Sequence, residues 1–256
     1  MSTISPTNPL DGVEALTFDV FGTVVDWHGT GTRALQDTAE RMGLNAEEDW
    51  SAFAKEWRDG YIQNTRAIAQ GGQASEGALN LDVLHREILD NMFTTPRWAH
   101  LSSAFDDKIR GELVMIWHRL NGWPDSSEGL YALKKRFIIT TLSNGNVRLL
   151  VDMAKYANLP WDVIFSGELL GGYKPNPKTY LGAAHHLSLP PSKVTMVAAH
   201  IHDLRSAALH GMKTVYVRRP TEDGGLQEAV KPKSEGGEVD LVMDSFVELA
   251  RALGCT

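Results

Sequence analysis

The chain has 256 residues, of which 43% are hydrophobic and 22% charged, a mixture typical of a globular protein with a sizeable core. A formal net charge of -7 and the lack of a long Lys/Arg run argue against a nucleic-acid partner, although a local cationic pocket can still bind a small anion. The single cysteine, Cys255, allows no disulfide within the chain. Residues 1–9 are expected to be a flexible N-terminus and show no signal-peptide pattern. No apolar run approaches the ~20 residues that a membrane span needs. These features predict a cytoplasmic protein without a membrane partner.

Short apolar runs that end in polar residues predict the strands. They are residues 15–18, 137–142, 163–165, 194–197 and 214–217, with a weaker run at 241–243. Continuous apolar strands suit a parallel sheet that is covered on both faces. Helical patterns over residues 146–157, 177–187 and 203–210 alternate with these strands, which indicates right-handed βαβ units. The predicted fold class is therefore α/β, with a doubly wound, Rossmann-like parallel sheet.

A long stretch after the first strand interrupts this alternation. Apolar residues recur at helical spacing over residues 31–42, 46–68, 81–93 and 103–120, and no convincing strand occurs there. The pattern predicts a core formed by residues 10–26 and 124–256, with a helical cap domain inserted as residues 27–123. Residues 221–238 are rich in Gly, Glu and Lys and predict a surface loop.

Functional residues are expected where the predicted strands end, because ligands bind at the carboxyl ends of open parallel sheets. Asp19 follows the first strand directly, and Gly22 allows a tight turn after it. A carboxylate held on such a platform can attack an electrophile and form a covalent intermediate. It can equally be a loop or helix-capping residue. The other strand ends supply Ser143, Asn144, Lys174, His200, His202 and Asp203.

Four segments resemble, in order and spacing, the four motifs of the haloacid dehalogenase superfamily. They are Asp-Val-Phe-Gly-Thr from Asp19, Leu-Ser-Asn-Gly from Leu142, Lys-Pro-Asn-Pro from Lys174 together with Tyr180, and Ala-Ala-His-Ile-His-Asp from Ala198. The resemblance covers the whole chain. It implies the core fold of that superfamily with an inserted helical cap, and a reaction that starts from Asp19 as nucleophile.

Within the superfamily, the chain is most similar to the type II L-2-haloacid dehalogenases. Phosphatases of the superfamily resemble Asp-x-Asp at the first motif, where the second acid protonates the leaving alkoxide, and here that position is Phe21. They also carry an extra acidic residue at the fourth motif for Mg²⁺, where this chain has Ala198, Ala199 and His200. The resemblance thus implies hydrolysis of a carbon–halogen bond without a metal or another cofactor. A Mg²⁺-dependent phosphatase or phosphonate hydrolase and a catalytically idle binding protein remain as alternatives.

The resemblance also implies roles for individual residues. A cap pair similar to Trp57-Arg58 brings Arg58 to the leaving halide, Lys174 offsets negative charge, and Asp203 orients the hydrolytic water. The residues expected to contact substrate are Thr23, Phe21, Ser143, Asn144, Tyr180 and Trp57.

The chain departs from the best-known dehalogenase pattern at the fourth motif, where His200 stands in place of Asn and Ala198 in place of Ser. His200 could assist the hydrolytic water or lie near the halide, and His202 is either a packing or a pocket residue. This variant resembles a branch in which some members act on fluoroacetate. The expected reaction converts short 2-haloalkanoic acids (haloacetates, L-2-haloacids) into 2-hydroxy acids and halide through an aspartyl ester. Family members are often dimers, so the resemblance allows a homodimer.

Overall fold

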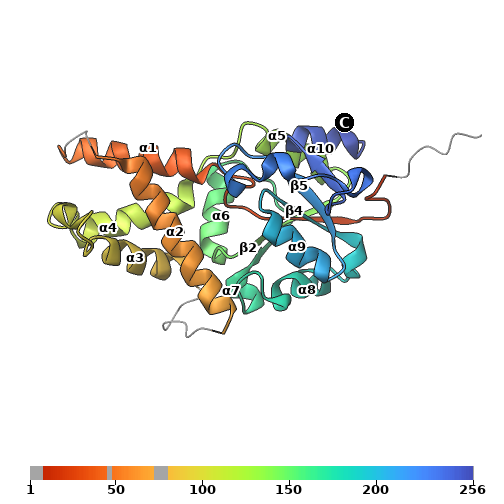
Figure 1. The fold of residues 1–256 in the computed structure, drawn as a ribbon, viewed down its shortest axis with the longest axis horizontal. Helices are drawn as coiled ribbons and strands as arrows, with labels where there is room; N and C mark the ends of the chain where they lie inside the picture. Colours follow the sequence, from red (N-terminus) through yellow and green to blue (C-terminus); the bar gives the residue numbers. More distant parts are fainter. Residues whose placement is uncertain (1–7, 45–47, 72–79, 256) are drawn as a thin grey trace, which may run out of the picture.

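The computed structural model describes residues 8–44, 48–71 and 80–255, and within them the centre of the protein is a six-stranded sheet (Figure 1). The strand order is β3-β2-β1-β4-β5-β6, and every pairing is parallel. The strands are β1 (Ala15–Phe18), β2 (Ile138–Ser143), β3 (Val163–Ser166), β4 (Val194–Ala198), β5 (Lys213–Val217) and β6 (Leu241–Met243). Because β1 pairs with both β2 and β4, the strand order reverses at β1, which is where open α/β sheets bind ligands.

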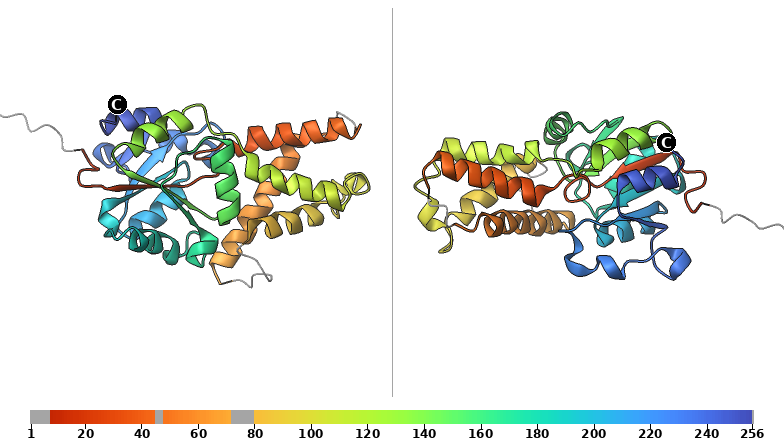
Figure 2. Two further views of the ribbon diagram at one scale, coloured as in Figure 1. Left: turned by 180° about the vertical axis from the view of Figure 1, so that it is seen from behind. Right: turned by 90° about the horizontal axis from the view of Figure 1, so that it is seen from above.

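Alternate residues of the strands are buried on opposite faces of the sheet. On β1, Leu16 and Phe18 belong to one apolar cluster, while Ala15 belongs to the other, together with Met196 and Tyr216. The first face is covered by α5 (Ser126–Lys134), α6 (Val147–Tyr156) and α10 (Phe246–Ala252), and the second by α8 (Pro177–His186) and α9 (Ile201–Leu209) (Figures 1 and 2). A short helix, α7 (Gly167–Leu170), follows β3. The predicted doubly wound α/β fold is confirmed.

The chain between β1 and α5 forms a layer of helices beside the sheet (Figure 2). It contains α1 (Trp27–Arg41), α2 (Trp50–Ala69), α3 (Leu81–Met92) and α4 (Asp107–Val114), with 3-10 turns η1 (Ala99–Leu101) and η2 (Met115–Arg119). No strand occurs in the described residues of this segment, in agreement with its helical pattern. Its division from the core as a separate cap domain with boundaries at residues 27 and 123 stays a prediction.

Several predicted boundaries are corrected by the structure. The expected helix over residues 103–120 is wrong as a single element, because α4 ends at Val114 and the backbone tightens into η2. Helix α1 begins at Trp27, four residues before the predicted start, because the Asp26 carboxylate accepts a hydrogen bond from the Gly29 N–H at 2.8 Å and caps the helix. Part of the predicted helix over 46–68, residues 46 and 47, lies outside the described residues. Helices α5 and α10 were not predicted.

The 221–238 segment is more than the expected surface loop. It contains three 3-10 turns, η4 (Asp223–Gly225), η5 (Gln227–Ala229) and η6 (Lys233–Glu235), and a further turn, η3 (Pro191–Lys193), precedes β4. Glu222 and Val230 are buried, so the prediction of a solvated loop is wrong at these positions. Val230 packs in the apolar cluster on one face of the sheet, and Glu222 contacts Trp27 and His200.

His118 connects the helical layer to the core. Its ring lies between two carboxylates, with Nε2 2.9 Å from Asp82 on α3 and Nδ1 2.9 Å from Asp152 on α6. Burial disfavours a charged ring, but the hydrogen bonds to both carboxylates outweigh it and raise the pKa of His118. Because ionised carboxylates only accept hydrogen bonds, both ring nitrogens donate, and the protonated ring joins the two layers by charge-assisted hydrogen bonds.

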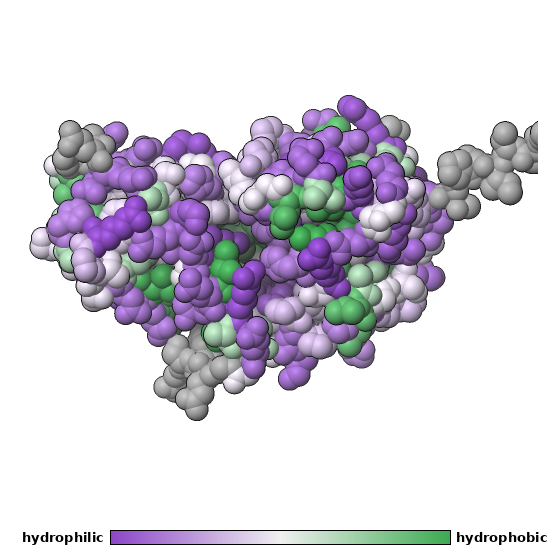
Figure 3. All heavy atoms as spheres, in the orientation of Figure 1, coloured by the Kyte–Doolittle hydropathy of each residue, from purple (hydrophilic) through white to green (hydrophobic). Residues whose placement is uncertain are grey.

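The surface in Figure 3 is largely hydrophilic, and hydrophobic side chains form small groups among the polar ones. The expected homodimer stays a prediction. No helix of residues 8–44, 48–71 and 80–255 combines the length and apolar character that crossing a membrane requires.

Candidate active site

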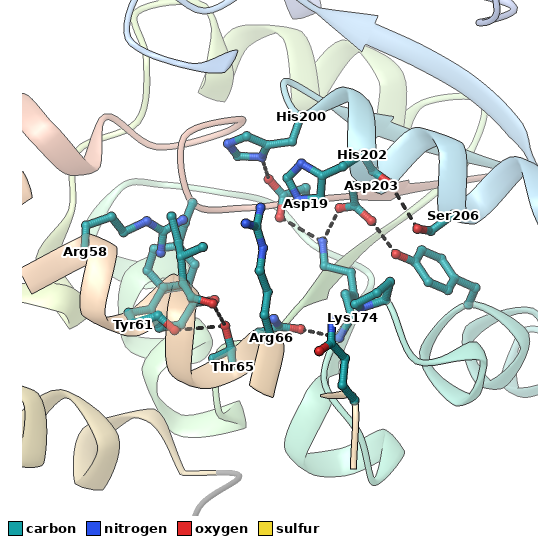
Figure 4. A pocket seen from close by; sticks show the side chains of 16 residues that line it. Asp19, Arg58, Tyr61, Thr65, Arg66, Lys174, His200, His202, Asp203 and Ser206 are labelled. Carbon is teal, nitrogen blue, oxygen red and sulfur yellow. Dashed lines mark hydrogen bonds and ion pairs between the residues drawn. The ribbon is translucent and has the colours of Figure 1, made fainter. Parts of the chain in front are cut away.

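A cavity of about 280 Å³ lies where helix α2 faces the carboxyl ends of the central strands (Figure 4). The core contributes Asp19, Phe21, Asn144, Lys174, Pro175, Tyr180, His200, His202, Asp203 and Ser206, and α2 with its C-terminal end contributes Arg58, Tyr61, Ile62, Thr65, Arg66 and Gln70. Residues distant in sequence meet here because parallel strands end at the same edge of the sheet. The cavity suits a small molecule rather than a polymer.

Asp19 is the most constrained side chain of the site. It is 7% exposed, and its backbone N–H donates to Val197 O at 3.0 Å, which extends the pairing of β1 with β4 by one residue. Its Oδ1 accepts from Lys174 Nζ at 2.9 Å, and its Oδ2 accepts from Thr23 Oγ1 at 2.7 Å. Burial tends to raise the pKa of Asp19, but Lys174 and His200 outweigh it and hold that pKa well below its usual range. The carboxylate is therefore ionised and anchored, as a nucleophile must be.

Lys174 joins two carboxylates. Its Nζ contacts both Asp19 Oδ1 and Asp203 Oδ2, and its backbone N–H donates to Asn144 Oδ1 at 2.7 Å. Burial lowers the pKa of Lys174, but the two aspartates outweigh it and raise the pKa above its usual value. The peptide bond from Lys174 to Pro175 is cis. A single ammonium group thus offsets two buried negative charges.

Tyr180 fixes Asp203 from the other side. The Tyr180 hydroxyl donates to Asp203 Oδ1 at 2.7 Å, and Asp203 is 4% exposed at the start of α9. Burial and the neighbouring carboxylate raise the pKa of the Tyr180 hydroxyl, which keeps it a donor. Asp203 therefore faces the cavity with both oxygens hydrogen-bonded (Figure 4).

His200 lies between two carboxylates. Its Nδ1 is 3.0 Å from Asp19 Oδ2, and its Nε2 is 2.8 Å from Glu222 Oε2. Ionised carboxylates only accept hydrogen bonds, so both ring nitrogens must donate, which requires an imidazolium. Burial opposes this charge, but the hydrogen bonds to Asp19 and Glu222 raise the pKa of His200 to about 10. His200 is thus a cationic donor at neutral pH.

Arg58 projects from α2 into an aromatic cradle. Its guanidinium carbon lies 4.3 Å from the ring centre of Tyr61, 5.1 Å from that of Phe21 and 5.5 Å from that of Trp27. The side chain is buried, and its Nη1 has no hydrogen-bond partner among the described residues. A buried guanidinium nitrogen without an acceptor is a favourable partner for an anion.

The remaining predicted site residues divide into two groups. Phe21, Asn144 and Tyr180 line the cavity, whereas Thr23, Ser143 and Trp57 do not. Thr23 still contacts Asp19, and Ser143 Oγ accepts from the Gly145 N–H at 3.1 Å and holds the turn after β2.

Trp57 points away from the cavity into the helical layer. Its Nε1 donates to His85 O at 3.0 Å, and its ring packs on Phe53 and Trp117. Successive helix residues point about 100° apart, so Trp57 cannot share the orientation of Arg58. His202, whose role the sequence left open, lines the cavity.

Several cavity or site residues were not predicted from the sequence, and Tyr61, Arg66 and Glu222 are the polar ones with the clearest place in the site. Tyr61 and Arg66 lie on the face of α2 that carries Arg58. They follow Arg58 by three and eight residues, and this helical spacing could have predicted that they share its face. Glu222 had no such signal, since it lies in an aperiodic segment. Figure 4 shows Arg66 extending from α2 toward the Asp19 and Asp203 carboxylates.

Among the described residues, no group of three or more His, Cys, Asp or Glu side chains is arranged to hold a metal ion. Asp19 and Asp203 face Lys174 instead, whose single positive charge offsets part of theirs. That the reaction needs no metal stays a prediction.

The fold and the site together are those of a hydrolase of the haloacid dehalogenase type. The family model for haloacid dehalogenase-like hydrolases matches residues 13–211. The chain therefore belongs to this family.

Relatives named as 2-haloacid dehalogenases are similar over most of the chain. A solved defluorinating L-2-haloacid dehalogenase is 40% identical, with a TM-score of 0.83 over 94% of this chain and 95% of that one. A second solved L-2-haloacid dehalogenase is 34% identical, with a TM-score of 0.81 over 94% of this chain and 99% of the other. (S)-2-haloacid dehalogenase 4A of Burkholderia cepacia is 29% identical over 82% of this chain and 85% of its own length.

Proposed function

We propose that this protein hydrolyses short 2-haloalkanoic acids to 2-hydroxy acids and halide through a covalent ester of Asp19. The observation that carries the proposal is the residue two positions after Asp19. It is Phe21, whose ring lies 5.1 Å from the Arg58 guanidinium carbon. The relatives named as 2-haloacid dehalogenases support the same substrate class.

Phe21 favours halide over alkoxide as the leaving group. An alkoxide leaves with the help of a proton from a general acid, and a phenyl ring carries none. A halide leaves as a stable anion and needs a cationic donor rather than a proton. Arg58 supplies that donor beside Phe21, in a buried setting where a fixed charge stabilises the transition state strongly.

The proposed reaction has two steps. In the first, the Asp19 carboxylate attacks C2 of the haloacid from the side opposite the halogen, the configuration inverts, and the halide departs toward Arg58. In the second, a water oriented by Asp203 attacks the Asp19 carbonyl carbon and releases the 2-hydroxy acid. An L substrate gives a D product. Lys174 offsets the charge of the two aspartates throughout.

Fluoroacetate belongs to the proposed substrate range. The 40% identical relative is named as defluorinating, and this supports extending the range to fluoride. Fluoride is small and strongly hydrated, so its departure demands close donors in a compact site. A cavity of about 280 Å³ with a buried Arg58 is consistent with that demand.

The test is halide release from chloroacetate, fluoroacetate and L-2-chloropropionate with a chelator present, for the wild type and Asp19→Asn. Release by the wild type and its loss in the variant are expected. No release from any substrate would overturn the proposal, and activity that depends on added Mg²⁺ would favour a phosphatase. Single turnover in ¹⁸O-water followed by mass analysis must label Asp19; label confined to the product would exclude the ester.

Arg58→Lys tests the leaving-group role with charge retained. Because lysine lacks the planar guanidinium that the aromatic cradle holds, we expect halide release to fall about 10²-fold. Arg97→Lys is the matched control, since Arg97 is exposed on the surface and pairs with Glu56. The expected homodimer rests on the family resemblance and is tested by sedimentation of the purified protein, whereas the expected cytoplasmic location rests on the sequence composition.

A further inference from the structure

The two oxygens of Asp19 are not equivalent. Among the described residues, Oδ2 accepts two hydrogen bonds, from Thr23 Oγ1 at 2.7 Å and from His200 Nδ1 at 3.0 Å, and Oδ1 accepts one, from Lys174 Nζ at 2.9 Å. A carboxylate oxygen has two lone-pair directions. Oδ2 has both occupied, whereas Oδ1 keeps one free for an electrophile. In the proposed reaction Oδ1 is therefore the attacking atom, and Oδ2 becomes the carbonyl oxygen of the ester.

We propose that Thr23 and His200 form the oxyanion hole of the ester-hydrolysis step, and that Glu222 is the positioning residue that holds His200 in it. This inference rests on the proposed function and assigns parts of the second step that the dehalogenase resemblance leaves open. When water adds to Cγ of the ester, the negative charge develops on Oδ2. Two donors are already in place around that atom.

Thr23 can serve this purpose because its hydrogen is directed. The Ala199 N–H donates to Thr23 Oγ1 at 2.9 Å, so the hydroxyl already accepts there and turns its own hydrogen toward Asp19. The side chain is fully buried and cannot exchange this partner for water. A donor aligned before the reaction costs no reorganisation when the oxyanion forms.

Glu222 is held as firmly as the histidine that it contacts. It is 6% exposed, its Oε2 faces His200 Nε2 at 2.8 Å, and its Oε1 accepts from Trp27 Nε1 at 2.8 Å and Thr221 Oγ1 at 3.0 Å. Gly22 adopts a φ of +85°, and a Cβ there would lie 2.5 Å from the Glu222 Cδ. A glycine therefore suits this turn both for its backbone conformation and for the space that the carboxylate needs.

The charge on Glu222 matters most after the ester has formed. Alkylation neutralises Asp19 and removes one of the two anions that keep His200 protonated. Glu222 remains and offsets the cations Arg58 and Lys174 near the site, while the neighbouring Asp203 is a further anion and the pKa of His202 is lowered by burial. His200 thus stays an imidazolium donor while the oxyanion develops, and it is a poor base for the water because both nitrogens already donate.

The step balances without a proton from His200. Oδ1 forms a bond to C2 while the carbon–halogen bond breaks and the halide keeps the electron pair. Water then adds to Cγ and gives a proton to the base Asp203, and Oδ2 carries the negative charge. Collapse breaks the Cγ–Oδ1 bond, protonated Asp203 returns its proton to the departing alkoxide oxygen, and the solvent oxygen remains in Asp19, whose carboxyl group releases the second water proton to solvent.

The experiment compares wild type, Glu222→Gln and the matched control Glu238→Gln, whose glutamate is half-exposed and pairs with Arg205 on the surface. Rapid-quench measurements with chloroacetate follow chloride release and, by intact mass, the enzyme ester. We expect Glu222→Gln to form the ester within about threefold of the wild-type rate but hydrolyse it about 10- to 100-fold more slowly. A burst of one chloride per site and accumulated ester are the signature, and the control behaves as wild type.

A pH profile separates this role from a structural one. Ester hydrolysis by Glu222→Gln should fall as pH rises through a His200 pKa that is no longer held up by Glu222, whereas the wild type shows no such fall between pH 6 and 9. Equal slowing of both steps, or hydrolysis at the wild-type rate, would overturn the inference while leaving the proposed function intact. If the wild type releases no halide at all, both are overturned.

Discussion

Replacing Lys174 by methionine removes a cation that contacts both Asp19 and Asp203 while nearly preserving the volume of the side chain. In the native protein the side chains of Lys174 and Asp19 are each 10% exposed and that of Asp203 is 4% exposed, so little solvent screens their charges. The variant leaves two buried carboxylates with less compensation. His200 still contacts Asp19, which makes Asp203 the carboxylate that loses most.

The magnitude follows from the contact geometry. Two unit charges about 4 Å apart interact by about 4 kcal/mol at the effective dielectric constant of a protein surface. Removing one partner of a buried ion pair costs about 3–5 kcal/mol, because the other charge remains buried without compensation. We therefore expect Lys174→Met to lower the free energy of unfolding by about 3–5 kcal/mol at pH 7.5 and to abolish halide release.

The loss should depend on pH with a definite sign. The folded-state pKa of Asp19 is depressed below its ordinary value of 3.8, so its contribution to stability is present above that value and disappears as pH falls through the folded-state pKa. Without Lys174, the largest influence that lowers the pKa of Asp19 is gone and burial opposes the charge, so that pKa lies above its wild-type value and the variant gains stability relative to wild type as Asp19 protonates. The difference between the two proteins should narrow from pH 8 to pH 5.

Urea denaturation at several pH values measures the effect. Lys178→Met is the matched control, because Lys178 is exposed at the start of α8. Adding Asp203→Asn to Lys174→Met should restore at least about 2 kcal/mol of the loss without restoring activity, since it removes the uncompensated charge. A loss that is the same at pH 5 and pH 8, and that the second substitution does not relieve, would refute the electrostatic reasoning.

Three further expected outcomes concern Tyr180, His118 and Arg66. Tyr180→Phe removes a donor 2.7 Å from Asp203, and the rate constant of halide release should fall about tenfold or more; an unchanged rate would mean that Asp203 needs no such support. His118→Gln removes a ring whose pKa is raised in the folded protein. That ring stabilises the fold fully below its unfolded-state pKa of about 6.5, and the stabilisation is lost as pH rises through the folded-state pKa. The loss of unfolding free energy in the variant, measured by urea denaturation, should therefore be larger at pH 5.5 than at pH 9, and a loss independent of pH would contradict this. Arg66→Ala should raise KM for chloroacetate about 3- to 10-fold with kcat unchanged, because the exposed guanidinium attracts anionic substrate; a change confined to kcat would place Arg66 in the chemistry instead.

Whether an element could be predicted from the sequence depended on how local the interactions are that form it. Strands such as β1 and β6 were predicted to the residue, because a buried parallel strand is apolar along its whole length. Helix α1 and the break between α4 and η2 were misplaced, because a side-chain cap and a local tightening of the backbone decide them. Helices α5 and α10 were missed, being short and stabilised by packing against the sheet.

The residues of the candidate site also divide into those that the sequence could predict and those that only folding places in the site. Asp19, Lys174, His200 and Asp203 could be found from sequence because the geometry of a parallel sheet brings successive strand ends to one edge. The identity of Phe21 was enough to favour halide over alkoxide as the leaving group. The sequence by itself thus determined the fold class, the family and the acidic, basic and aromatic groups available for the chemistry.

Tertiary structure decided how those groups are oriented and charged. Only folding directs Arg58 into the cavity and its neighbour Trp57 away from it, and only folding brings Glu222 to His200. Contacts of this kind join an aperiodic segment to the edge of the sheet, so no pattern along the chain encodes them. Folding likewise brings Thr23 and His200 to the same oxygen of Asp19, because hydrogen bonds and burial act through space and depend on where the backbone carries each side chain.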